Sequence, residues 1–232
     1  MNPFAGAVDL LLGGDAYLWS VVLRSLSISG SALVLAVVVG LPVGAAVALS
    51  SLRRRPAVVA LLNTGLALPP VVVGLAVYLL LSRSGPLGGL ELLYSPAAVV
   101  GAQVVIAGPY VAAITLGAVA GVPGDVRLQA RALGASRLQA LWLHLRECRA
   151  SLVAAVAAAF GSIISEVGAV LIVGGNVLGE TRVMTSAIVL ETRRGNFEAA
   201  VALGAVLLLV AFAVNLALTL LNRGTMRRPW LA

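Results

Sequence analysis

Long stretches without a charged residue constrain the fold of this chain more than any other feature. Four of them cover residues 25–52, 57–82, 97–122 and 199–222, and they are 28, 26, 26 and 24 residues long. An α-helix needs about 20 apolar residues to cross roughly 30 Å of hydrocarbon, so each stretch is long enough. A fifth stretch, 150–179, is interrupted only by Glu166. The pattern predicts an all-α, multi-pass membrane protein with about five transmembrane helices.

The first 24 residues differ from these stretches. They begin without positive charge, and Asp9 and Asp15 interrupt their apolar residues, so we do not expect a secretory signal. Phe4, Tyr17 and Trp19 favour a short helix at the membrane interface, where aromatic rings lie at headgroup depth. We expect residues 1–232 to form a single transmembrane domain, with 1–24 as its interfacial N-terminal segment.

The basic residues predict the orientation of the chain. All sixteen are arginines, and a five-helix arrangement puts eleven on one side and five on the other. The positive-inside rule places the richer side in the cytoplasm, so the N-terminus is outside and the C-terminus inside. This asymmetry also explains the net charge of +7 without a nucleic-acid partner. The inner arginines are Arg53, Arg54, Arg55, Arg127, Arg131, Arg137, Arg146, Arg149, Arg223, Arg227 and Arg228; the outer ones are Arg24, Arg83, Arg182, Arg193 and Arg194.

Polar and helix-breaking residues predict irregularities inside and between the stretches. Pro69 and Pro70 are expected to kink the helix of 57–82, either beside a pore or as a packing irregularity. Gln103 predicts a hydrogen bond between helices. Residues 83–96 are rich in turn formers and predict an external loop. Residues 177–198 are too polar and too short for another full span.

A polar insert at 123–150 lies between two apolar stretches, and the arginine distribution places it in the cytoplasm. Asp125 is expected to cap a first helix, Gly134 to end that helix in a left-handed conformation, and Ser136 to cap a second helix. The apolar residues of the second helix follow helical spacing; they are Leu138, Leu141, Trp142 and Leu145. Such a helix either docks into a groove on a soluble partner or lies on the membrane surface. His144 and Cys148 are interpreted as ordinary residues of this helix.

Residues 128–136, followed by the region of Trp142, resemble the cytoplasmic EAA loop of ABC-importer permease subunits. Leu128 and Gln129 stand where that family has glutamate and alanine. The resemblance implies a fold like that of type I ABC importers and a loop that contacts a separate ABC ATPase. The implied coupling residues are Ala130, Arg131, Leu133, Gly134, Ala135 and Ser136.

The segment after the insert indicates which group of importer permeases the chain resembles. Residues 166–169 and 174–176 resemble the segment that follows the EAA loop in sulfate, molybdate and tungstate permeases. Residues 181–188, 191–192 and 195–197 are most similar to the tungstate type. The resemblance implies the permease subunit of an oxyanion importer, with tungstate as the favoured substrate and molybdate or sulfate as alternatives. It also implies a homodimer in a bacterial or archaeal cell membrane that receives its substrate from an extracytoplasmic binding protein.

The candidate translocation path or gate consists of Glu166, Gly168, Gly175, Asn176, Thr181, Arg182 and Thr185. An ionisable group inside a span is costly and usually faces a cavity or a partner. Glu166 is therefore expected either to act at a gate or dimer contact, or to be held by Ser162, Ser165 or neighbouring backbone. Its negative charge argues against direct binding of a dianion.

Residues 181–186 of the same segment carry three hydroxyl groups and one arginine. Thr181, Thr185 and Ser186 are candidate neutral donors to a passing anion, which would hold it weakly enough for release. Arg182 either attracts an oxyanion, pairs with acidic groups of the binding protein, or is a solvated loop charge.

Missing residue types exclude several enzyme classes. The chain has no lysine, so it lacks the P-loop of an ATPase, and one histidine cannot form the zinc motif of a metalloprotease. A single cysteine excludes a disulfide within the chain. We expect no catalysis, cofactor or metal, and ATP hydrolysis on a separate chain. Two other classes stay open, an ion-coupled secondary transporter and a membrane scaffold, although the former usually shows inverted repeats and several intramembrane charges.

Overall fold

The computed structural model describes residues 3–50 and 55–226, with side chains described as far as Asn222. Every regular element in these ranges is helical, which confirms the all-α prediction. The elements are α1 (Pro3–Leu12), α2 (Ala16–Leu49), α3 (Arg55–Leu66), α4 (Pro70–Leu81), the 3-10 helix η1 (Gly88–Leu90), α5 (Pro96–Gly121), α6 (Gly124–Ala132), α7 (Arg137–Glu147), α8 (Arg149–Ile164), α9 (Gly168–Gly174), α10 (Met184–Arg193) and α11 (Phe197–Met226).

Three described helices, α2, α5 and α11, are each long and apolar enough to cross a membrane. Two further pairs of helices pass the same test together but are bent, α3–α4 by 102° and α7–α8 by 66°. The count of spans therefore reaches the predicted five only if each bent pair is one span. α2 alone has 34 residues, a length of about 51 Å at the rise of an α-helix.

The first long helix begins earlier than predicted. Asp15 caps α2, since its carboxylate accepts a hydrogen bond from the Leu18 backbone N–H at 2.8 Å. The helix therefore starts at Ala16, and Arg24 lies within it instead of at its start. The segment expected to be one interfacial helix is divided by a turn at Gly14, whose φ is +67°. α1 precedes that turn and packs against α11.

The second apolar stretch does not form one kinked helix. α3 ends at Leu66, Pro69 caps α4 and Pro70 occupies its first turn. A proline disfavours helical conformation in the residue before it but suits the first turn of a new helix, so two adjacent prolines separate α3 from α4. The expected kink is thus a complete break with a 102° change of direction.

The stretch of residues 150–179 is broken twice. α8 ends at Ile164, and α9 begins at Gly168, so the first break surrounds Glu166. The second break follows α9, where Gly175 ends the helix with a φ of +65°. α10 lies within the expected external segment 177–198 and is too short to span a membrane, in agreement with the prediction.

α5 is the centre of the fold, because it packs against α2, α3, α4, α8 and α9. Its buried residues extend from Ala98 near one end to Val119 near the other. Gln103 of α5 donates a hydrogen bond to the Ile163 carbonyl oxygen of α8 at 3.2 Å, which confirms the predicted bond between helices.

α2 approaches α5 closely at two glycines. A Cβ atom added at Gly40 would lie 2.7 Å from the Val111 Cβ, and one added at Gly44 would lie 2.8 Å from the Thr115 Cβ. The Cβ added at Gly44 would also overlap the Ala112 carbonyl oxygen.

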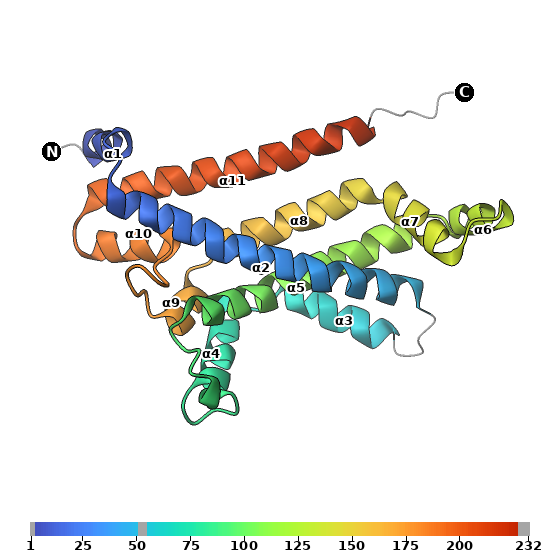
Figure 1. Cartoon of the computed structure of the whole chain (residues 1–232), viewed down its shortest axis with the longest axis horizontal. Coiled ribbons are helices and arrows are strands. Elements are labelled where there is room, and N and C mark those ends of the chain that lie inside the picture. The colour runs from blue at the N-terminus through green and yellow to red at the C-terminus, as the bar shows by residue number, and fades with distance from the viewer. Residues whose placement is uncertain (1–2, 51–54, 227–232) are drawn as a thin grey trace.

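Figure 1 shows the insert helices α6 and α7 at one end of the molecule and α1, α9 and α10 towards the other. This separation agrees with the predicted placement of the insert and the outer segments on opposite sides. Arg53, Arg54, Arg227 and Arg228, which contributed to the predicted orientation, lie outside the described residues, and the side chain of Arg223 is likewise not described.

The close approach of α2 and α5 makes a prediction about stability. Gly44→Ala should lower the thermal unfolding temperature of the purified protein in detergent, because overpacking costs about 1–3 kcal/mol. Gly30→Ala, in the same helix, is the matched control, since no atom lies within 4 Å of its added Cβ. Equal unfolding temperatures for the two variants would contradict the packing described here.

Candidate functional site

The polar insert folds as two short helices joined at a glycine. Gly134 has a φ of +90°, the left-handed conformation expected of it. Ser136 caps α7 through the Gln139 N–H at 3.2 Å, and the Gln139 side chain accepts from the Ser136 N–H at 2.8 Å. The prediction for Asp125 is wrong, because Pro123 occupies the cap position of α6. Asp125 lies in the first turn, where its charge still complements the helix dipole.

The candidate coupling residues lie around this glycine. Ala130 is buried, whereas Leu133 is 89% exposed and Arg131, Gly134 and Ser136 are also exposed. The Ala135 N–H donates to the Ala130 carbonyl oxygen at 3.0 Å, which closes the turn between the helices. The structure therefore brings all six residues together, and their contact with an ATPase stays a prediction.

The apolar residues of the insert divide into two sets. Leu141 and Leu145 are half-buried, on the side of α7 that faces α2, α5 and α8. Leu128, Leu133, Leu138 and Trp142 are 61–89% exposed. The Arg146 guanidinium lies 5.3 Å from the centre of the Trp142 ring. The insert thus presents an exposed surface with an aromatic side chain and arginine, the residue types that concentrate binding energy in protein interfaces.

Glu166 holds the break between α8 and α9. Its carboxylate accepts a hydrogen bond from the Ala169 N–H at 2.9 Å, and its carbonyl oxygen accepts from the Thr185 hydroxyl at 2.7 Å. The side chain is 9% exposed. The carboxylate is thus held by neighbouring backbone, one of the partners expected for it. The Ser165 hydroxyl, another expected partner, donates to the Gly161 carbonyl oxygen instead. Glu166 therefore fixes the start of α9 and connects it to α10.

Two glycines allow α9 to lie directly against α4. A Cβ added at Gly168 would lie 2.5 Å from a methyl group of Val71. A Cβ added at Gly74 of α4 would lie 2.6 Å from the Ala169 Cα. The short helix next to Glu166 is consequently packed backbone to backbone on the reoriented half of the broken second stretch.

The loop after α9 contains the other predicted gate residues. Asn176 is left-handed, with a φ of 56°, and its side-chain oxygen accepts from Ser186 at 3.0 Å and from the Arg182 Nε at 3.3 Å. The Thr181 hydroxyl donates to the Gly174 carbonyl oxygen and accepts from the Val177 N–H at 2.9 Å. This loop is held in one shape by its own polar side chains.

The hydroxyl groups expected to serve a passing anion are engaged within the protein. Thr181, Thr185 and Ser186 are all buried, and each donates to an oxygen of the chain. Arg182 is half-buried and lies 5.9 Å from the Tyr17 ring centre, so it is not a fully solvated loop charge. A role of these residues in translocation stays a prediction.

Sequence reasoning missed three residues that hold the outer segments. The Ser25 hydroxyl of α2 accepts from the Met184 N–H at 2.7 Å, and Arg24 donates to the Gly179 carbonyl oxygen. The Tyr94 N–H donates to the Val173 carbonyl oxygen at 2.9 Å. The Tyr94 ring covers Gly175, where an added Cβ would lie 2.8 Å from a ring carbon. No local pattern indicates these contacts, since each partner lies 79 or more residues away in the sequence.

A second polar cluster, which sequence reasoning also missed, joins α2, α10 and α11. Glu191 is 4% exposed, and its carboxylate accepts from the Tyr17 hydroxyl at 2.9 Å and from the Asn196 amide at 3.0 Å. Arg194 lies 3.5 Å from the same carboxylate. Tyr17 and Glu191 are 174 residues apart, so only the folded chain places them together.

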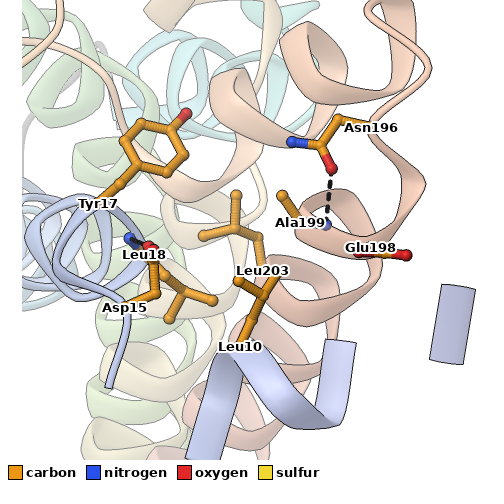
Figure 2. A pocket seen from close by; sticks show the side chains of 8 residues that line it. All are labelled: Leu10, Asp15, Tyr17, Leu18, Asn196, Glu198, Ala199 and Leu203. Carbon is orange, nitrogen blue, oxygen red and sulfur yellow. Dashed lines mark hydrogen bonds between the residues drawn. The ribbon is translucent and has the colours of Figure 1, made fainter. Parts of the chain in front are cut away.

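A small pocket of about 170 Å³ lies beside this cluster (Figure 2). Figure 2 shows Leu10, Leu18 and Leu203 on one side and Tyr17 and Asn196 above them, with Asp15 and Glu198 at the edges. Two carboxylates on its wall disfavour a dianion, so this pocket is unsuitable for an oxyanion. Within the described residues, no group of three or more histidine, cysteine, aspartate or glutamate side chains is arranged to hold a metal ion.

Comparisons with known proteins agree with the fold. Residues 20–227 match the family described as "Binding-protein-dependent transport system inner membrane component". A "Probable anion ABC transporter permease protein" of Haloferax volcanii is 44% identical over 204 residues, 86% of this chain and 88% of that protein. The "Tungstate uptake system permease protein TupB" of Peptoclostridium acidaminophilum is 37% identical over 212 residues, 91% of this chain and 93% of that protein.

Among solved structures, a chain of an inward-facing MetNI methionine ABC transporter superimposes with a TM-score of 0.71. The match covers 91% of this chain and 97% of that chain, at 17% sequence identity. At this level of identity the likeness concerns the fold, and it supports the expectation of a fold like that of type I importers.

Glu166 offers a direct test of the candidate gate. Glu166→Ala should leave membrane insertion intact and lower substrate uptake by about tenfold, since hydrogen bonds to a charged group contribute about 1.5–3 kcal/mol. Glu166→Gln keeps an oxygen acceptor for the Ala169 N–H and should retain most of the uptake. Ser165→Ala is the neighbouring control. Uptake by Glu166→Ala at the wild-type rate would refute a role for this residue.

Proposed function

Because the chain belongs to the family of binding-protein-dependent transport system inner membrane components, we propose that it is the permease subunit of an ATP-driven oxyanion importer. In this proposal residues 1–232 act as one transmembrane domain, with 1–24 at the membrane interface and 123–150 in the cytoplasm. A homodimer of this chain associates with two ABC ATPase subunits, and an extracytoplasmic binding protein delivers the substrate. The observation that carries the proposal is the insert itself, an exposed helix pair at one end of the membrane-spanning helices.

The energy for transport has to enter from another protein in this proposal. The chain contains no lysine and hence no P-loop, so ATP hydrolysis occurs on the partner ATPase. The partner would bind the exposed surface formed by Leu128, Leu133, Leu138 and Trp142. Closure of the ATPases would then displace α6 and α7 and switch access from the outer to the inner side by a rigid-body movement of helices.

Tungstate is the substrate that we propose. One relative, at 37% identity, is named as a tungstate uptake permease, and another, at 44% identity, as an anion permease. Arg24 and Arg182 both bond to the loop that follows α9, where two positive charges would raise the local concentration of a dianion. The buried hydroxyls of that loop would contact an anion only after the loop rearranges. Molybdate and sulfate are the alternative substrates.

Reconstituted uptake tests the substrate and the source of energy together. Proteoliposomes that contain the protein, its ATPase and its binding protein should take up labelled tungstate only when ATP is present on the side of the membrane where the ATPase lies. Unlabelled tungstate should compete at lower concentration than molybdate or sulfate. Stronger competition by molybdate or sulfate would overturn the substrate assignment. Uptake driven by an ion gradient without ATP would favour a secondary transporter and overturn the importer proposal.

The glycine between α6 and α7 tests the coupling role of the insert. Gly134→Val forces a branched side chain into a φ of +90°, so the helix pair should lose its shape. We expect ATP hydrolysis to persist while uptake per ATP falls about tenfold, within the usual range of coupling free energies. Gly124→Val, at the start of α6 with open space around it, is the control. Normal uptake per ATP in Gly134→Val would contradict the coupling role.

A further inference from the structure

The only histidine of the chain, His144, connects the insert to the central helix. It lies on α7 and is 3% exposed. Its Nε2 lies 3.0 Å from the Val119 carbonyl oxygen in the last turn of α5. A carbonyl oxygen only accepts hydrogen bonds, so the histidine proton in this bond is on Nε2. An apparently ordinary residue of the second insert helix thus bonds to the helix around which the fold is built.

Within α6 and α7, this is the one side-chain hydrogen bond to another described part of the chain; where the insert ends, the Asn222 amide of α11 donates to the Ala150 carbonyl oxygen at 3.1 Å. The other side-chain hydrogen bonds of residues 124–147 stay within the insert, and none of its arginines forms an ion pair with a described residue. The neighbouring contacts are apolar: Cys148, Leu145 and Leu152 pack with Val119 and Ala48. Apolar contacts allow sliding, whereas a hydrogen bond has a preferred distance and direction.

The position of the bond makes it suitable for transmitting a movement. Val119 is 1% exposed and lies two residues before α5 ends at Gly121. α5 has 26 residues, a length of about 39 Å, and its other end adjoins Tyr94, which covers Gly175 at the end of α9. A displacement of α7 that keeps the bond intact therefore pulls on one continuous helix that extends to the candidate gate.

We propose that His144 is a positioning residue that transmits displacement of the insert to α5 through its hydrogen bond to the Val119 carbonyl oxygen. This inference rests on the proposed function, because it concerns how the work of the ATPase reaches the membrane-spanning helices. The ring contributes in two ways. Its Nε2–H fixes the separation of α7 and α5, and burial keeps water from replacing the carbonyl as partner.

Two amide variants separate this role from simple packing. The side chain of His144→Gln places an N–H donor at a reach similar to that of Nε2, whereas His144→Asn is one methylene shorter. Both introduce a buried amide of similar polarity, so they differ mainly in whether they reach Val119. Glu147→Gln, an exposed change on the same helix, serves as the control.

The experiment measures tungstate uptake and ATP hydrolysis in the same proteoliposomes containing the permease, the ATPase and the binding protein. We expect His144→Gln and Glu147→Gln to keep the wild-type ratio of substrate to ATP. His144→Asn should lower this ratio about fivefold or more, the lower end of typical coupling effects, while ATP hydrolysis continues.

Each other outcome overturns the proposal. Equal ratios in His144→Asn and His144→Gln would show that the hydrogen bond does not transmit movement. Loss of complex assembly in His144→Asn, with normal assembly in His144→Gln, would assign the bond a structural role instead. Failure of the wild-type complex to couple ATP hydrolysis to uptake would refute the proposed function, and this result is distinct from a defect confined to the His144 variants.

Discussion

The packing of α5 against its neighbours is the constraint on which the rest of the structure depends. Small residues on α2 let the two backbones approach until Gly44 has no room for a side chain next to Ala112. Small residues are the usual means by which membrane helices pack closely, since apolar surface gains little from leaving lipid. Gln103 then joins α5 to α8 through a buried hydrogen bond. With α5 held in this way, the insert follows one end of it and the outer segments surround the other.

The two ends of α5 meet different kinds of structure. At the outer end, Tyr94 contacts α9, and α9 begins where Glu166 accepts a hydrogen bond from its backbone. At the inner end, Val119 accepts a hydrogen bond from the insert. Two of the five apolar stretches are broken, at Pro69 and near Glu166, and consist of short helical segments. A continuous helix between broken ones is a physical basis for movement at one side affecting the other.

The sequence predicted those features that depend on neighbouring residues. Absence of charge over more than 20 residues indicated the long helices, and the glycine and serine of the insert indicated its turn and cap. Features that depend on distant contacts were not predictable. The break at Glu166 depends on Thr185 of another helix. The early start of α2 was missed although its signal is local, since Asp15 accepts a hydrogen bond from the Leu18 N–H three residues later. His144 was interpreted as an ordinary residue because its partner lies 25 residues away, and the contact of Glu191 with Tyr17 was missed because 174 residues separate them.

The central claim is that displacement of the insert moves the outer end of the same chain, and a distance measurement across one protomer tests it most directly. Nitroxide labels are attached to cysteines that replace Glu147 on the insert and Leu178 in the loop after α9, both exposed, in complexes where labelled permease is diluted with unlabelled permease. The account predicts that trapping the ATPase with nucleotide and vanadate shifts the distance distribution within the labelled protomer. An unchanged distribution in a complex that has trapped nucleotide would contradict it.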